Sequence, residues 1–119
     1  MLKAKNRLKK KKEFAYIYRK NNAFYSKYLT LYTASTKSKS CKIGFSVSNK
    51  VGNSVVRHKV KRRLSEIVRK QVSSLPVKNY IFVAKINSDK LSFSQLEKEV
   101  DYLLKKVDNE KSVENKDEK

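Results

Sequence analysis

Basic side chains crowd the stretch from residue 54 to residue 71, where their spacing suits contact with phosphate groups. Residues 57–70 contain seven Lys and Arg against one acid, Glu66. A solvated helix face normally mixes both signs and gains pairs four residues apart. Arg57 and Lys59 would also lie in the first turns of a helix, where the macrodipole repels each cation by roughly a few tenths of a kcal/mol. We therefore expect a polyanionic ligand that relieves this repulsion, with nucleic acid as the first candidate.

The predicted contacts lie on the outer side of this helix and along its flanks. His58 could in principle act as a general base, but no carboxylate or nucleophile lies near it in the sequence. Contact with a phosphate or a base is therefore the better interpretation of this histidine. The predicted nucleic-acid contacts are Arg57, His58, Lys59, Lys61, Arg62, Arg63 and Arg69.

Tyrosines form a second candidate surface. Tyr28 and Tyr32 alternate with Leu29 and Leu31, which predicts a strand with one aromatic face, and Tyr18 lies in the preceding helical segment. Bases of single-stranded RNA stack on exposed aromatic rings with about 1–3 kcal/mol each. Packing in the core is the alternative for these tyrosines, and the pattern leaves both open. For Phe14, Phe45, Phe82 and Phe93, periodic positions favour the core.

The sequence offers little catalytic chemistry. Cys41 is the only cysteine and His58 the only histidine, so neither an internal disulfide nor a Cys/His zinc site is expected. No glycine-rich phosphate loop and no paired carboxylates occur outside the acidic tail. We predict a binding protein with no catalytic residue and no metal site of its own. The lone cysteine also fits a reducing, cytoplasmic setting.

Hydrophobic periodicity predicts an α+β fold that positions these residues. We expect strands 24–34 and 41–48 to pair as a hairpin, and strand 80–86, apolar on both faces, to lie in the interior of the sheet. A further short strand is expected near residues 22–26. The predicted helices contain Phe14, Ile17 and Tyr18 on one face of the first, residues 54–71 in the second and residues 92–107 in the third. Asn21 and Asn22 are expected to end the first helix, and SFSQ (92–95) can form a capping box at the start of the third. Cys41 faces the predicted core of its strand and is expected to be buried.

The 119 residues are enough for one domain, which we expect to span residues 1–107 behind a basic N-terminal arm. Residues 1–88 hold 23 Lys and Arg against 2 acids, a charge of +21, whereas residues 89–119 hold 7 against 9, a charge of −2, so the net charge of +19 comes entirely from the first segment. Residues 108–119 are expected to be a disordered tail. No apolar run is long enough to span a membrane, and no secretory signal is recognisable.

Four segments together resemble the protein component of bacterial ribonuclease P. They are KNRLKKKKEF (5–14), LYT (31–33), FSVSNKVGNSVVRHKVKRRLSE (45–66) and NYIFVAK (79–85). The resemblance implies an α/β sandwich of three helices and a four-stranded sheet with a left-handed βαβ crossover. It also implies a holoenzyme in which a catalytic RNA, with Mg²⁺ bound mainly by that RNA, removes the 5′ leader of precursor tRNA. The protein would bind the catalytic RNA, in a 1:1 complex, and the precursor tRNA.

By the same resemblance, the basic helix faces the catalytic RNA near the substrate. The leader would occupy a cleft formed by Phe14, Tyr18, Tyr32, Ser46, Ser48 and Lys50. Three positions depart from the family pattern. The family commonly has Asn where this chain has His58, and Arg where this chain has Lys59 and Ser65. Lysine keeps the charge but loses the bidentate fork of arginine. A serine at position 65 is expected to remove a cation from the middle of the outer face.

Two other functions are compatible with the residues alone. A general RNA-binding or ribosome-associated protein would bind structured RNA without discriminating a leader. A nuclease made of protein alone would need a carboxylate cluster, which the sequence lacks outside its acidic tail.

Overall fold

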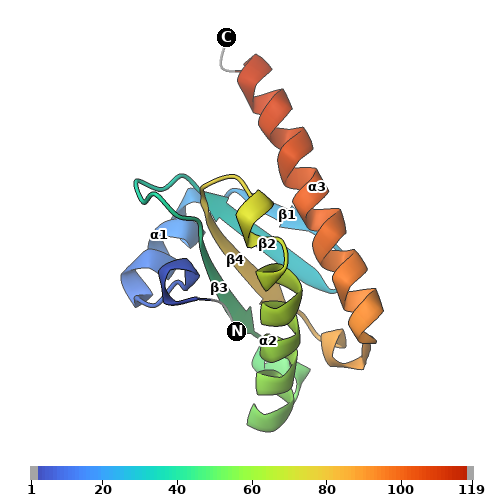
Figure 1. Ribbon diagram of the computed structural model, residues 1–119. Helices are drawn as coiled ribbons and strands as arrows, with labels where there is room; N and C mark the ends of the chain where they lie inside the picture. The colour runs from blue at the N-terminus through green and yellow to red at the C-terminus, as the bar shows by residue number, and fades with distance from the viewer. Residues whose placement is uncertain (1–2, 118–119) are drawn as a thin grey trace.

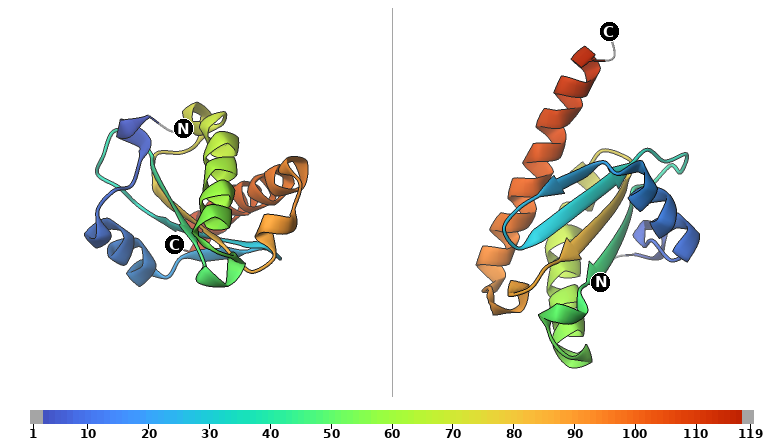
Figure 2. Two further views of the ribbon diagram at one scale, coloured as in Figure 1. Left: turned by 90° about the horizontal axis from the view of Figure 1, so that it is seen from below. Right: turned by 180° about the vertical axis from the view of Figure 1, so that it is seen from behind.

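A four-stranded sheet carries helices on both of its faces. The computed structural model describes residues 3–117, except for the side chains of residue 4 and residues 108–117. Helix α1 (Lys11–Lys20) covers one face, and α2 (Ser54–Arg69) and α3 (Phe93–Asp117) cover the other (Figures 1 and 2). Four short 3-10 helices complete the described chain: η1 (Ala4–Asn6), η2 (Asn49–Val51), η3 (Val72–Ser74) and η4 (Ser88–Lys90).

The sheet consists of β1 (Ala23–Tyr25), β2 (Leu29–Ala34), β3 (Lys42–Val47) and β4 (Asn79–Ala84), in the order β1-β2-β4-β3. Strand β4 pairs antiparallel with β2 and parallel with β3. Its predicted interior position is therefore confirmed, but the predicted hairpin of β2 and β3 is wrong. The reason is that β4 is apolar on both faces and gains most burial between two other strands.

The connection from β3 through α2 to β4 is left-handed, as the family resemblance implies. In Figure 1 both strands point downward, α2 lies in front of the sheet, and β4 lies to the right of β3. The general preference is for right-handed connections. The crossover is thus an exception that sequence periodicity alone would not predict.

Each face of the sheet has its own hydrophobic core. The larger one joins β2, β3 and β4 to α2 and α3, with Leu31, Ile43, Phe82, Leu64 and Val100 all buried. The smaller one lies under α1 and contains Leu8, Ile17, Ala34 and Ile81. Alternate residues of each strand therefore point to different helices, and residues of one strand can serve two different surfaces.

The expected helix signals are present at α1 and α3. Helix α1 ends at Asn21, which has the left-handed φ of 53°. At α3, the Ser92 Oγ accepts a hydrogen bond from the Gln95 N–H at 3.1 Å, and the Gln95 side chain accepts one from the Ser92 N–H at 2.9 Å. This pair is the predicted capping box.

Several predicted boundaries need correction. Residues 24–34 form two strands, with a turn in which the Ser26 N–H donates to the Leu29 carbonyl at 2.9 Å, so the expected extra strand near 22–26 is confirmed as β1. Helix α3 continues to Asp117 instead of ending near 107, because Lys and Glu in this part favour helix. Phe93 is 39% exposed, since it lies at the first turn of α3 before the helix meets the core.

Two predictions about the ends of the chain have different outcomes. The basic N-terminal arm is folded against the sheet edge in its described part, where Leu8 is buried and its N–H donates to the Ile43 carbonyl at 3.0 Å. For residues 108–117 only the backbone is described, and residues 118–119 lie outside the described residues. The disordered tail and the domain boundary at 107 therefore stay predictions. Among the described helices, none has the length and apolar character to cross a membrane.

Candidate nucleic-acid interface

Helix α2 presents a cluster of unpaired cations to solvent. Asn53 begins the helix by accepting a hydrogen bond from the Val56 N–H at 3.0 Å. Val60 and Leu64 hold the helix to the sheet, where both are buried. Four exposed members of the predicted set, His58, Lys59, Lys61 and Arg62, form no ion pair with any side chain that the structure describes. We call these four residues the basic face.

The other predicted contacts on α2 are partly engaged by the protein itself. Arg57 is half-buried, and its Nη1 donates to the Asn49 Oδ1 at 2.8 Å. Arg63 donates to the Leu91 carbonyl at 3.3 Å, which ties α2 to the segment before α3. Arg69 pairs with the Glu66 carboxylate at 2.9 Å, and that hydrogen bond lowers the pKa of Glu66. These three arginines are therefore less free to bind a ligand than the basic face.

Arg57 differs from the other two in one respect. Its Nε is buried and has no hydrogen-bond partner among the described groups. An unsatisfied buried donor normally costs about 1–3 kcal/mol.

Ser65 does not occupy the position expected for it. Its side chain is buried rather than lying in the middle of the exposed face, with 2% exposure. The cause is the N-terminal segment: Arg7 and Leu8 lie along the edge of β3 and line a pocket together with Ser65 and Lys61. The serine at this position therefore makes room at the sheet edge, and the expected loss of an outward cation is wrong.

On the opposite face, the predicted cleft residues of α1 and the sheet come together. Tyr18 and Tyr32 pack edge to face with their ring centroids 4.8 Å apart. Burial raises the pKa of Tyr18, opposed by a hydrogen bond with the Ser46 side chain. The Phe14 ring lies so close to Gly44 that a Cβ at this position would meet the Phe14 Cζ at 2.5 Å. Phe14 and Tyr32 both pack against the smaller core, and a side chain larger than glycine at position 44 would displace the Phe14 ring. The cleft for the leader stays a prediction.

The remaining cleft residues lie where β3 ends. Ser48 precedes η2 and its Oγ accepts a hydrogen bond from the Lys50 N–H at 3.2 Å. Ser48 is half-buried and Lys50 is exposed. Lys50 is therefore available to a ligand, whereas the Ser48 hydroxyl already supports the turn.

The outer edge of β3 connects the basic face with the predicted cleft. The sequence did not indicate this connection. A pocket of about 150 Å³ includes Phe14 from the α1 side and Lys61 from the α2 side, together with Arg7. A second hollow of about 270 Å³ has Phe45 in its lining beside His58 and Lys61. Phe45 is thus only half-buried, although its alternation with Ile43 predicted the core. Only the pairing order could have revealed its place at an edge.

Comparison with known proteins identifies the family. The family model described as Ribonuclease P matches residues 2–108. This chain belongs to the ribonuclease P protein family. Its relatives include the ribonuclease P protein components of Bacillus velezensis, 33% identical over 107 residues (89% of this chain and 92% of the relative), and of Clostridium botulinum, 36% identical over 104 residues (86% and 94%). The structure of the Staphylococcus aureus RNase P protein superimposes with a TM-score of 0.80 at 29% identity, covering 86% of this chain and 94% of that one.

Membership in the ribonuclease P family establishes the general function. The chain is an accessory protein subunit of ribonuclease P, a tRNA-processing holoenzyme, and its partner is the RNA subunit. The α+β fold inferred from the resemblance is also confirmed. Family membership does not show which residues contact RNA. The assignment of contacts to the basic face and to the predicted cleft therefore depends on their geometry.

Proposed function

We propose that the subunit uses its two surfaces for two different RNAs. The basic face, supported by Arg57, Arg63 and Arg69, binds the catalytic RNA. The cleft of Phe14, Tyr18, Tyr32 and Ser46, extended by Ser48 and Lys50, binds the single-stranded 5′ leader of precursor tRNA. The complex with the RNA subunit is 1:1 and acts in the cytoplasm.

The observation that carries this proposal is the placement of the surfaces on opposite sides of the β3 edge. Cations without counter-ions attract a phosphate backbone at any sequence, so the basic face suits a large structured RNA. The rings of exposed Tyr18 and half-buried Tyr32, above small residues, suit single-stranded bases, which stack without requiring a particular sequence. A protein that binds both RNAs can hold the leader beside the catalytic RNA.

Magnesium belongs to the RNA in this proposal. The described residues include no group of three or more His, Cys, Asp or Glu that could hold a metal ion. Phosphate oxygens of the RNA would supply the ligands, and bound Mg²⁺ would activate water and stabilise charge on the phosphate. The protein's cations reduce repulsion between two polyanions, so less Mg²⁺ should be needed for their association.

The decisive experiment is reconstitution with the cognate catalytic RNA. We expect the protein to restore leader removal at low Mg²⁺, and we expect no cleavage by the protein without the RNA. Equal affinity for precursor and mature tRNA would instead favour a general RNA-binding role. Cleavage by the protein alone would favour a nuclease made of protein.

Arg62→Ala tests the basic face. Removing one phosphate contact should lower the magnitude of the slope of log K against log[salt] for the catalytic RNA by about one unit. Filter binding at several salt concentrations measures this slope. Lys98→Ala, which removes an exposed cation from α3, is the matched control, and an equal change in both variants would contradict the assignment.

Tyr32→Ala tests the cleft. Loss of one stacking ring should weaken the binding of precursor tRNA by about 1–3 kcal/mol and leave the binding of mature tRNA nearly unchanged. The ratio of the two dissociation constants measures the effect and cancels any general loss of folded protein. Tyr102→Ala removes an exposed tyrosine from α3 and should leave the ratio unchanged. A ratio that stays at the wild-type value in Tyr32→Ala would exclude leader binding at this ring.

A further inference from the structure

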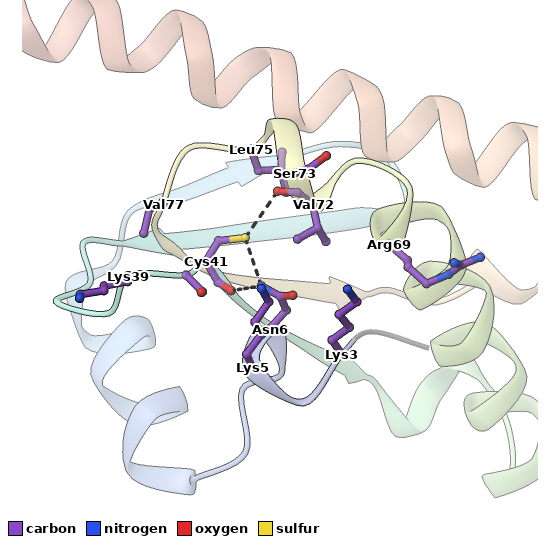
Figure 3. A pocket seen from close by; sticks show the side chains of 11 residues that line it. Lys3, Lys5, Asn6, Lys39, Cys41, Arg69, Val72, Ser73, Leu75 and Val77 are labelled. Atoms are coloured by element: carbon purple, nitrogen blue, oxygen red, sulfur yellow. Dashed lines mark hydrogen bonds between the residues drawn. The ribbon is translucent and has the colours of Figure 1, made fainter.

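A third concave surface lies at the end of the sheet where β3 begins. It is a pocket of about 360 Å³ between η1, the loop before β3 and the segment that follows α2 (Figure 3). Asn6 and Cys41 lie at its centre, with Lys39 on one side and Lys3 and Arg69 on the other. Neither the basic face nor any cleft residue contributes to its lining.

Hydrogen bonds of the buried Asn6 and Cys41 side chains hold the centre of this pocket in place. Asn6 is 5% exposed, and its Nδ2 donates to the Cys41 carbonyl at 2.8 Å. The Cys41 thiol is buried, with its Sγ 3.8 Å from the Val72 carbonyl. These contacts fix η1 against β3 and the segment after α2. Lys3 and Lys5, the near neighbours of Asn6 in the chain, are therefore anchored at the pocket by their backbone.

The lining is strongly cationic. Lys3, Lys5, Lys39 and Arg69 all contribute to it, and no carboxylate among the described side chains does. Within the part of the chain that the structure describes, none of the three lysines forms an ion pair. The Glu66 carboxylate neutralises Arg69 from outside the lining.

The dipole of α2 does not account for this concentration of charge. The last turn of a helix favours cations, which explains Arg69 in that turn. The three lysines, however, lie just before η1, within η1 and in the loop before β3, so their presence needs another cause. Cations from three segments around a fixed floor form a site for a multiply charged anion.

We propose that this pocket binds consecutive phosphate groups, as a third anion site separate from the basic face and the cleft. The cations lie on both sides of Asn6 and Cys41 instead of converging on one point, which fits a chain of phosphates better than a single ion. The chain can be a phosphodiester strand of RNA or a free oligophosphate. In the first case the site deepens the proposed function, because it adds a phosphate contact beyond α2.

The test uses the whole isolated protein, labelled with ¹⁵N, and follows backbone amides by NMR. Sodium tripolyphosphate is the first probe and a short oligouridylate the second. We expect tripolyphosphate to shift the amides of Asn6, Cys41 and Val72 in a saturable manner. Lys5→Gln/Lys39→Gln should weaken this binding by about two- to fivefold for each lysine removed. Lys90→Gln/Lys98→Gln removes the same charge from exposed positions outside the pocket and should leave the affinity unchanged.

The outcomes separate the possible sources of phosphate. Shifts at the pocket with both probes, competing with each other, identify a phosphodiester strand as a ligand, whereas shifts with tripolyphosphate alone identify a free oligophosphate. Absence of shifts at these three amides with both probes would overturn the proposal, as would an equal loss of affinity in the two double variants. Since no catalytic RNA is present, a failure here is distinct from a failure of leader removal in the reconstituted holoenzyme.

Discussion

At the scale of single residues, small side chains determine the shape of the proposed leader cleft. Gly44 lies beneath the Phe14 ring, and Ser46 lies beside Tyr18 on the same face of β3. A larger residue in either position would fill the space above the strand. The aromatic rings can therefore lie partly open to solvent because the side chains of the neighbouring strand are small.

Gly44→Ala should destabilise the protein and displace Phe14. The new Cβ would lie 2.5 Å from the Phe14 Cζ and 3.1 Å from the Leu8 Cδ2, so the ring must move. Overpacking of this kind costs about 1–3 kcal/mol, which a urea titration can measure. Adding Phe14→Leu to Gly44→Ala should recover part of that loss. Strictly additive effects of the two substitutions would show that ring and glycine do not interact.

Glu13 should make stability depend on pH below neutrality. Burial tends to raise the pKa of this carboxyl, but the hydrogen bond from the Lys10 backbone and the charge of Lys42, 3.6 Å away, lower it below the usual glutamate value. A lowered pKa in the folded state adds stability above the unfolded-state value, and this stability is lost as the pH falls through the folded value.

Urea midpoints between pH 6 and pH 3 test this prediction. Glu13→Gln should show a shallower fall in stability with acid than the wild type, because its amide does not titrate. Glu97→Gln, which removes a carboxylate from α3, is the comparison. Parallel curves for Glu13→Gln and the wild type would mean that this pair does not contribute.

At the scale of elements, α2 combines a stable core side with an electrostatically strained outer side. Val60 and Leu64 are buried, while His58, Lys59 and Arg62 are exposed without counter-ions in the described chain. The first turn contains no acidic residue to balance the helix dipole. The helix therefore depends on its tertiary packing and on its N-cap, and it keeps its cations free for RNA.

Substitutions at Asn53 should separate the stability of α2 from its binding of RNA. Asn53→Ala removes the acceptor for the Val56 N–H and should cost about 1 kcal/mol of folding stability. Asn53→Asp keeps the cap and adds a favourable charge at the positive end of the helix, so its stability should equal or exceed that of the wild type. The same negative charge should weaken binding to the catalytic RNA by roughly two- to fivefold at low salt.

Thermal unfolding and filter binding measure the two effects. Tighter RNA binding by Asn53→Asp would contradict the view that the start of α2 faces phosphate. A less stable Asn53→Asp would contradict the capping argument instead.

At the scale of the whole molecule, the basic residues and the last core helix lie in different parts of the chain. Residues 1–88, which supply the sheet, α1 and α2, carry a charge of +21, more than the net +19 of the whole chain. Residues 89–119 are slightly acidic and supply α3, whose buried residues end at Val107 among the described side chains. In our proposal the cationic part binds RNA, while α3 completes the larger core.

Removal of residues 108–119 should leave the folded protein almost unchanged. The buried residues Leu96, Val100, Leu103 and Val107 all remain, so we expect the midpoint of thermal unfolding to stay within about 4 °C, which is less than about 1 kcal/mol for a domain of this size. Calorimetry measures this midpoint. A larger fall would show that the last part of α3 contributes to the domain and would contradict the predicted boundary at 107.

Local patterns account for the parts of the fold that neighbours in sequence determine. The extent of α2, the caps of α1 and α3, the burial of Cys41 and the interior place of β4 follow from periodicity and capping residues. The basic face follows equally directly, because three cations and a histidine near one another in sequence stay together on one helix. The cleft residues came from the family resemblance, since composition left Tyr18 and Tyr32 open between core and surface.

Long-range pairing decided the rest. The left-handed crossover places β4 between β2 and β3, which makes β3 an edge strand and leaves Phe45 half-buried. The N-terminal segment then covers Ser65 and closes the pocket around Asn6, for which we propose phosphate binding. The sequence by itself determined which residues can bind RNA, because charge and aromatic character are properties of side chains. Only the tertiary structure decided which of them share a surface, because strand order depends on burial summed over the whole sheet.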